Sequence, residues 1–332
     1  MKQYLTGFFM AWGNFCALPC PCKRWDTNAT PLMLGFLPSV GVIIGAIWAI
    51  LYFAAVYFGL PYLVVAFLVT FLPFVLCGFL HMDGFMDCSD AILSRRPLED
   101  RQRILKDSHT GAFAVISIVF YILAYFAFTS TAITIGIDFA NMLLLVCLSR
   151  SVSGLHVLIA KPMQTSQYVK MNAASEAAPV PADDDFSAVN PATIKAEAAA
   201  DPAALSVSCD NTKAEAGSDP IPAAVAPSAS CDSAAAAPEA SIAAADAPRE
   251  ARPATKKQGI VLLLAQLVIY LALAFWCSSY PIVTAIMCAF TVCAVCAAIF
   301  YGRRQLGGMN GDIAGYGILW GELFGMLALA LF

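Results

Sequence analysis

The chain has 332 residues, of which 60% are hydrophobic and only 13% are charged, about half the charged share of an average soluble protein. Its 19 basic and 23 acidic residues leave a formal net charge of -4, without the basic excess that is typical of nucleic-acid binding. The composition therefore excludes an ordinary soluble globule and argues against a nucleic-acid partner.

The first apolar stretch, residues 4–18, is too short to span a bilayer and is interrupted by Gly13 and Asn14. It predicts an interfacial or re-entrant helix and not a signal peptide. Longer apolar runs, each close to the roughly 20 residues that cross a membrane core, follow at 34–58, 62–80, 113–135, 141–160, 259–277, 282–300 and 313–332. The predicted fold is all-α: a polytopic integral membrane protein with about seven transmembrane helices.

The distribution of Lys and Arg predicts the topology, because these residues concentrate in cytoplasmic loops. With Lys23 and Arg24 inside, the loops predicted outside contain no basic residue, and 18 of the 19 basic residues lie on the cytoplasmic side. Arg150 is the exception. Both Arg150 and Glu322 lie within predicted spans, where an ionisable side chain is a functional hypothesis by default. We expect a multi-pass protein of the cell membrane whose active site faces the cytoplasm.

Residues 172–257 differ in composition from the rest of the chain. They contain 30 alanines in 86 residues, recurrent prolines and a single aromatic residue, Phe186, and such a segment buries too little apolar surface to offset its ordering entropy. We predict a disordered cytoplasmic insertion. It separates an N-terminal membrane part, 1–171, with the interfacial helix and four spans, from a C-terminal membrane part, 258–332, with three spans.

An acidic cluster follows the second predicted span. Asp83, Asp87 and Asp90 are four and three residues apart, so on a helix they share one face. Three like charges repel one another unless a cation lies between them. Mg²⁺ is a suitable cation, because it binds a few carboxylates and keeps positions open for substrate phosphates.

Cations and glycines complete the predicted site. Arg95, Arg96 and Lys106 follow the aspartates, and phosphoryl transfer requires cations that neutralise developing charge; the positive-inside rule is sufficient to explain Arg101 and Arg103. A second segment, 301–317, contains Arg303, Asp312 and the glycines Gly307, Gly308 and Gly311, which suit close backbone approach to a phosphate or a tight turn. His81 and His109 flank the acidic cluster, either as groups that orient the site or as interfacial residues.

These segments resemble the signature of the cobalamin synthases, the adenosylcobinamide-GDP ribazoletransferases of vitamin B12 assembly. The family pattern runs close to His-Leu-Asp-Gly-Leu-Ala-Asp-Thr-Ala-Asp-Gly, then Met-Lys-Asp-Ser-Arg-Ile-Gly-Ala-Phe-Gly. The matching positions are His81, Asp83, Gly84, Asp87, Asp90, Lys106, Asp107, Ser108, Gly111, Ala112 and Phe113. Residues 307–312 resemble the closing Gly-Gly-x-x-Gly-Asp, and residues 19–45 also fit.

The chain departs from this pattern at several places. Ala91 and Ala114 replace glycines, His109 replaces an arginine, and Cys16-Ala17-Leu18-Pro19 replaces a Thr-Arg-Ile-Pro-like run. The long insertion is not a family feature. The three aspartates are unchanged.

The resemblance implies a Mg²⁺-dependent transferase that joins adenosylcobinamide-GDP to α-ribazole, or to its 5'-phosphate, and releases GMP. Its expected partners are these corrinoid and ribazole substrates and the lipid bilayer; a homo-oligomer or association with other corrinoid-assembly enzymes is left open. Together the patterns and the resemblance assign metal binding to Asp83, Asp87 and Asp90, catalysis to His81, Lys106, Asp107 and Asp312, and substrate binding to Arg95, Arg96, Arg150, Gly307, Gly308 and Gly311.

Two alternatives from other classes remain. A CDP-alcohol phosphotransferase has a similar aspartate spacing, but its motif places an Ala-Arg pair where this chain has Asp87 and Cys88. In an ion-coupled transporter the aspartates would bind the coupling ion, while Arg150 and Glu322 would line a path. The absence of a visible internal repeat, and the gathering of acids in one loop, count against the transporter.

Overall fold

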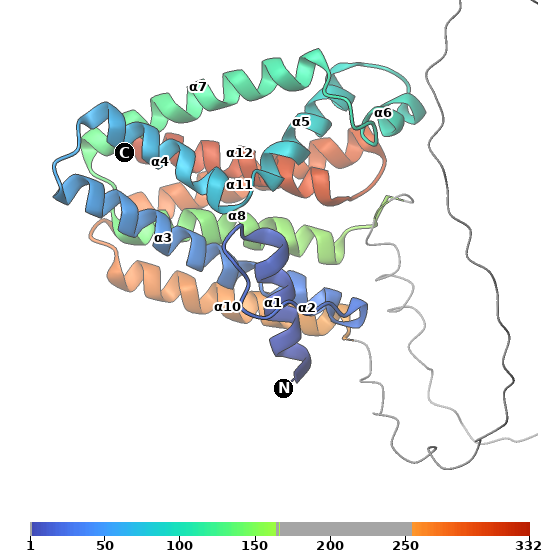
Figure 1. Ribbon diagram of the computed structural model, residues 1–332, viewed down its shortest axis with the longest axis horizontal. Coiled ribbons are helices and arrows are strands. Elements are labelled where there is room, and N and C mark those ends of the chain that lie inside the picture. The colour runs from blue at the N-terminus through green and yellow to red at the C-terminus, as the bar shows by residue number, and fades with distance from the viewer. Residues whose placement is uncertain (1, 164–165, 167–253) are drawn as a thin grey trace, which may run out of the picture. The chain divides into compact units, whose positions relative to one another are not determined.

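The computed structural model describes residues 2–163, 166 and 254–332 (Figure 1). These residues belong to one compact unit. The predicted disordered insertion lies outside the described residues, apart from its last four positions. The described part of the chain folds into helices, with one isolated parallel bridge between Pro162 and Met309, which confirms the all-α prediction.

The N-terminal segment contains four helical elements: α1 (Lys2–Phe15), the short 3-10 helix η1 (Thr27–Ala29), α2 (Thr30–Gly35) and α3 (Leu37–Tyr57). The predicted short first helix is present as α1. The predicted span 34–58 begins a few residues later than expected, because α2 ends at Gly35 and Pro38 occupies the first turn of α3, where proline is tolerated.

The second predicted span is broken. α4 (Tyr62–Leu76) and α5 (Leu80–Leu93) meet at an angle of 87°, so the continuous span expected over 62–80 ends early. Gly78 and Phe79 both adopt the left-handed backbone conformation, with φ of 62° and 60°, and such a pair cannot continue a right-handed helix. The break turns the aspartate-bearing helix away from the axis of α4.

The remaining elements are α6 (Leu98–Ile104), α7 (Ala112–Ile135), α8 (Phe139–Ile159), α10 (Lys256–Cys277), α11 (Pro281–Leu306) and α12 (Gly311–Leu331). Among the described residues, six helices are long and apolar enough to cross a membrane, namely α3, α7, α8, α10, α11 and α12. The bent pair α4–α5 gives seven if it is counted as one span. The prediction of about seven spans is therefore confirmed.

The bundle is organised around α8 and α12. In their apolar 18-residue stretches 78% and 72% of the residues are buried inside the protein, against 6% in α10. Small residues permit this packing. A Cβ atom at Gly41 of α3 would lie 2.7 Å from the Cα of Cys147 in α8, and one at Gly45 would lie 2.8 Å from the Cα of Leu143. Figure 1 shows α8 and α12 running through the bundle while α10 lies along its edge.

Candidate active site

The three predicted aspartates lie on α5, and their helical spacing is confirmed. His81, Phe85 and Cys88 belong to the buried side of this helix. Asp83 is exposed, whereas Asp87 and Asp90 are half-buried. The carboxylates therefore form an edge of α5 between its packed face and the open surface.

α12 brings a fourth carboxylate to this edge. Asp312 lies in the first turn of α12, and its Oδ2 accepts a hydrogen bond of 2.6 Å from the amide of Asn310. Asn310 also caps the helix, because its Oδ1 accepts from the backbone N–H of Ile313 at 2.9 Å. One residue thus starts α12 and orients Asp312.

Gly84 permits α5 and α12 to approach closely. A Cβ atom at this position would lie 2.8 Å from the Cα and 3.0 Å from the carbonyl oxygen of Asp312. One turn further along α12, a Cβ atom at Gly315 would lie 3.1 Å from the carbonyl oxygen of His81. The two glycines allow backbone-to-backbone contact, and this contact places Asp312 beside the aspartates of α5.

The four carboxylates form a region of negative charge. Asp87 experiences unfavourable electrostatic interactions with Asp83, Asp90 and Asp312, and Asp312 also interacts with Asp83. The described residues contain no group of three or more His, Cys, Asp or Glu side chains gathered tightly enough to hold a metal ion alone. The donor set nevertheless suits Mg²⁺, which commonly uses one or two carboxylates and takes its other ligands from phosphate and water.

The loop between α6 and α7 contacts this cluster through Gly111. A Cβ atom there would lie 2.1 Å from both carboxylate oxygens of Asp90, so Asp90 occupies the space that a side chain would need. Lys106 and Asp107, in the same loop, are exposed. The contact shows that this loop packs against the aspartate helix at Gly111; the predicted roles of Lys106 and Asp107 stay predictions.

His109 organises the loop through Asp107. The carboxylate oxygen Oδ1 of Asp107 accepts hydrogen bonds from the His109 backbone N–H, at 3.0 Å, and lies 2.6 Å from Nδ1 of the imidazole ring. These bonds favour the ionised carboxylate and lower the pKa of Asp107 below its ordinary value. His109 therefore orients a local turn, and its predicted role in orienting the acidic site stays a prediction.

The predicted cations follow α5, and the predicted glycines lie between the end of α11 and the start of α12. Arg95 and Arg96 are exposed directly after α5, available for a soluble anion. Gly307 adopts φ of 83° at the end of α11, and Gly308 packs so closely that a Cβ atom would lie 2.7 Å from the backbone of Met163. Gly311 is the first residue of α12. Tight turns account for Gly307 and Gly308, and phosphate contact by the three glycines stays a prediction.

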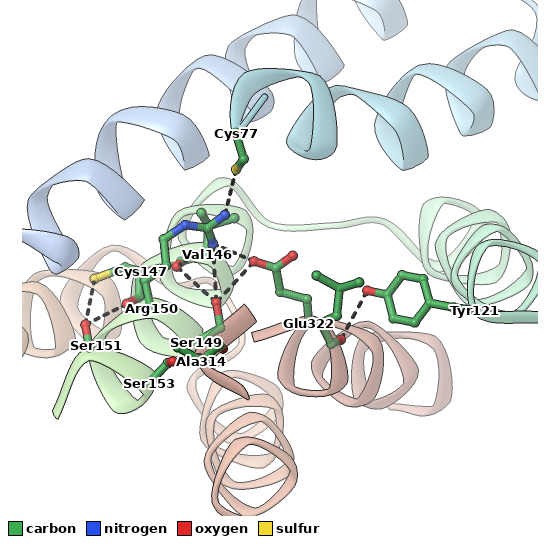
Figure 2. A network of polar contacts seen from close by, with 11 residues as sticks. Cys77, Tyr121, Val146, Cys147, Ser149, Arg150, Ser151, Ser153, Ala314 and Glu322 are labelled. Carbon is green, nitrogen blue, oxygen red and sulfur yellow. Dashed lines mark hydrogen bonds and ion pairs between the residues drawn. The ribbon is translucent and has the colours of Figure 1, made fainter. Parts of the chain in front are cut away.

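A second ionic group lies within the bundle (Figure 2). The guanidinium of Arg150 on α8 is 2.5 Å from Oε1 of Glu322 on α12, and both side chains are at most 3% exposed. Nη1 also donates to the carbonyl oxygen of Val146 at 3.0 Å, and Nη2 donates to Sγ of Cys77 at 2.8 Å, while the buried Nε has no hydrogen-bond partner among the described residues. The predicted substrate-binding role of Arg150 finds no support in this position, because the side chain is buried and paired inside the protein.

His81 faces this buried pair rather than the aspartates. It is 6% exposed and lines a small cavity together with Cys77, Arg150 and Glu322. Asp83 and Asp90, two and nine residues further along α5, point to the opposite side of the helix at 100° per residue. The structure thus separates His81 from the carboxylate edge, and its predicted catalytic role has no geometric support.

Comparison with known proteins adds the decisive observation. The family model described as cobalamin-5-phosphate synthase matches residues 7–189 and 223–330, most of the chain. The chain belongs to this family. The matched ranges include the α5 aspartates, the α6–α7 loop and Asp312, and the interruption, 190–222, lies within the predicted insertion.

Individual proteins that are similar to this chain share one description. An adenosylcobinamide-GDP ribazoletransferase of Clostridium perfringens strain 13 is 36% identical over 170 residues, covering 51% of this chain and 68% of the relative. A protein of the same description from Clostridium botulinum strain Eklund 17B is 41% identical over 119 residues, covering 36% of this chain and 47% of the relative. Another, from Lachnoclostridium phytofermentans, is 31% identical over 172 residues, covering 50% of this chain and 63% of the relative. No solved structure matches the chain.

Sequence reasoning missed the role of α6 in this cobalamin-5-phosphate synthase family member. Arg101 is not a free surface cation: its Nη1 donates to Oε1 of Gln305 on α11, and the neighbouring Gln102 donates to the carbonyl oxygen of Leu306 at 2.8 Å. These bonds attach α6 to the end of α11, directly before the glycine-rich turn. The amide side chains Gln102 and Gln305 were the available signal, but only the fold shows that they meet.

Proposed function

We propose that this protein joins adenosylcobinamide-GDP to α-ribazole, or to α-ribazole 5'-phosphate, with release of GMP. Family membership and the names of the relatives support the reaction. The observation that carries the location of the site is the contact between Gly84 and Asp312, because it gathers carboxylates from two distant matched segments.

The reaction proceeds by substitution at phosphorus. The ribose hydroxyl oxygen forms a bond to the phosphorus nearest the cobinamide, while the bond from this phosphorus to the bridging oxygen breaks. The bridging oxygen leaves on GMP with the electron pair. The hydroxyl proton passes to a carboxylate, and we assign this role to Asp312, because Asn310 orients its side chain and a general base must be held within reach of the proton.

The remaining residues have electrostatic roles. Lys106, Arg95 and Arg96 are exposed cations in the segments that follow α5, and in this proposal they neutralise charge that develops on the diphosphate. Asp83, Asp87 and Asp90 would hold Mg²⁺ together with substrate oxygens. When bound, the metal would supply Lewis-acid stabilisation of the phosphoryl oxygens. The Lys and Arg distribution supports a cytoplasmic orientation of this site in the cell membrane.

The test uses the full-length protein in nanodiscs of neutral phosphatidylcholine. Adenosylcobinamide-GDP, Mg²⁺ and either α-ribazole or its 5'-phosphate are added, and GMP and the corrinoid product are measured by mass spectrometry. We expect equimolar GMP and product, and neither when the metal is chelated. GMP with adenosylcobinamide phosphate in place of the ribazole-joined corrinoid would indicate hydrolysis, and absence of both GMP and the joined product with each acceptor would refute the proposal.

A further inference from the structure

A cavity of about 560 Å³ lies between the last turns of α1 and the irregular segment 16–25. Its volume falls within the range of small-molecule sites, roughly 300–1,000 Å³. Its lining includes Asn14, Lys23, Arg24 and Trp25. None of these residues belongs to the carboxylate edge described above.

The wall of this cavity is held by hydrogen bonds from several elements. The indole of Trp12 donates to the carbonyl oxygen of Leu18 at 3.2 Å, and the thiol of Cys20 donates to the carbonyl oxygen of Phe9 at 3.6 Å. Pro19 and Pro21 further restrict the backbone, because proline fixes φ. The segment therefore forms a defined wall beside α1.

The chemistry of the lining suits an anionic aromatic ligand. Trp25 is 67% exposed, so its indole offers a free surface for stacking. Lys23 and Arg24 are adjacent exposed cations. Nε of Arg24 donates to Sγ of Cys22 at 3.2 Å, and since sulfur is a weak acceptor, the fork of the guanidinium keeps donors for an oxyanion.

The cavity wall contacts the end of α4 and the break that precedes the aspartate-bearing helix. The backbone N–H of Ala17, on the cavity wall, donates to the carbonyl oxygen of Leu76 at 2.8 Å. A Cβ atom at Gly78 would lie 3.6 Å from the Cβ of Ala17. These contacts attach the wall to the break between α4 and α5, and Asp83 follows in the first turn of α5.

We propose that this cavity binds the guanosine phosphate part of the corrinoid substrate, with the base against Trp25 and phosphate oxygens against Lys23 and Arg24. Two adjacent cations and an exposed indole match a purine nucleotide with a phosphate group better than an uncharged ligand. The inference rests on the proposed function for the identity of the nucleotide, and on the cavity for its place.

The test measures binding of GMP itself, without turnover, by calorimetry on the full-length protein in neutral phosphatidylcholine nanodiscs. Trp25→Ala should raise the Kd by about 5- to 100-fold, the range expected for loss of one base–aromatic stack, and Trp25→Phe should restore most of the affinity. The matched control is Trp276→Ala, since Trp276 is an 88% exposed tryptophan on α10 and should leave the Kd unchanged.

A second pair of measurements tests the phosphate contact. The double variant Lys23→Ala/Arg24→Ala should weaken GMP binding at least about fivefold, while the weaker binding of uncharged guanosine should be the same in the variant and the parent protein. Unchanged GMP affinity in both Trp25→Ala and the double variant, or no GMP binding by the parent protein, would overturn the proposal. Impaired membrane insertion with unchanged affinity would identify these residues as an interfacial anchor instead.

These outcomes are separable from failure of the proposed function. A protein that binds GMP in this cavity but forms no corrinoid product would retain the site and lose the reaction. A protein that forms the product while all variants bind GMP normally would retain the reaction and lose this site.

Discussion

The molecule contains two groups of ionisable side chains, and they are satisfied in opposite ways. Arg150 and Glu322 neutralise each other inside the bundle, with Cys77 and backbone oxygen as further partners. Asp83, Asp87, Asp90 and Asp312 all carry the same sign and interact unfavourably. The charge of the first group is balanced within the protein, whereas the second has a charge that an external cation or a proton must balance.

This difference separates a structural role from a chemical one. Both groups attract attention in the sequence for the same reason, namely charge near or within apolar segments. The ion pair joins the two most buried helices, α8 and α12. The carboxylate edge lies where α5 meets the start of α12, and its carboxylate at Asp83 is exposed. Internal charge balance, rather than the presence of charge, distinguishes the two.

The largest effect on activity is expected from Asp87→Asn. The substitution preserves size and removes one charge from the centre of the carboxylate group, so turnover should fall by more than about a thousandfold, beyond the 10–100-fold typical of outer-shell metal partners. Product formation in nanodiscs measures it. Asp100→Asn, which alters an exposed carboxylate paired with Arg103 on α6, is the control. Activity within threefold of the parent protein would remove Asp87 from the site.

Breaking the buried pair of Arg150 and Glu322 should lower the stability of the protein. Glu322→Gln leaves the guanidinium of Arg150 without its counter-charge, and we expect a loss of about 3–5 kcal/mol in the free energy of unfolding, the cost of breaking a buried ion pair. Thermal unfolding in detergent, followed by circular dichroism, measures the direction of the change.

The double variant Arg150→Met/Glu322→Leu sharpens this test, because apolar side chains of similar volume fill the buried site and leave no charge away from water. It should recover most of the stability lost in Glu322→Gln. If the stable double variant also lost turnover completely, the pair would belong to the chemistry and the comparison would fail.

Lys106→Ala tests whether the exposed loop supplies a catalytic cation. Turnover should fall by roughly a hundredfold, on the scale of removing one preorganised electrostatic group. Arg103→Ala is the matched control, since its side chain is 74% exposed and pairs only with Asp100 on the same helix in the described structure; less than about threefold change is expected. Equal effects would mean that Lys106, like Arg103, contributes only to the orientation of the protein in the membrane.

Gly84→Ala should have the smallest effect of the four. The added methyl group meets backbone of Asp312 at 2.8 Å, so α5 and α12 must move apart, and we expect about a tenfold loss of turnover from the displaced carboxylates. The control is Gly302→Ala, in which the methyl group meets only side-chain atoms, of Ile313 and Tyr316, the nearest at 3.3 Å, and these can shift. Similar activity in the two variants would show that the close approach at Gly84 is not needed.

The sequence predicted the elements of this fold better than their breaks and pairings. Apolar length revealed the spans, and the spacing of Asp83, Asp87 and Asp90 revealed their common face, because both are local properties of the chain. The break after α4 depends on Phe79 in a left-handed conformation, which side-chain type does not disclose, although Pro73 and Gly78 are nearby. The pairing of Arg150 with Glu322 and the attachment of Arg101 to Gln305 are tertiary, so neither could be derived from spacing.

The break between α4 and α5 has a consequence for the N-terminal segment. At the end of α4 the carbonyl groups of Pro73, Phe74 and Val75 accept hydrogen bonds from N–H groups of the break itself. The last carbonyl group of the helix, that of Leu76, accepts instead from the backbone N–H of Ala17 at 2.8 Å, because the left-handed residues that follow cannot continue the helix. The segment after α1 thus supplies the hydrogen bond that ends α4, and its removal would take away the partner of the Leu76 carbonyl group and loosen the turn that leads into the aspartate-bearing helix.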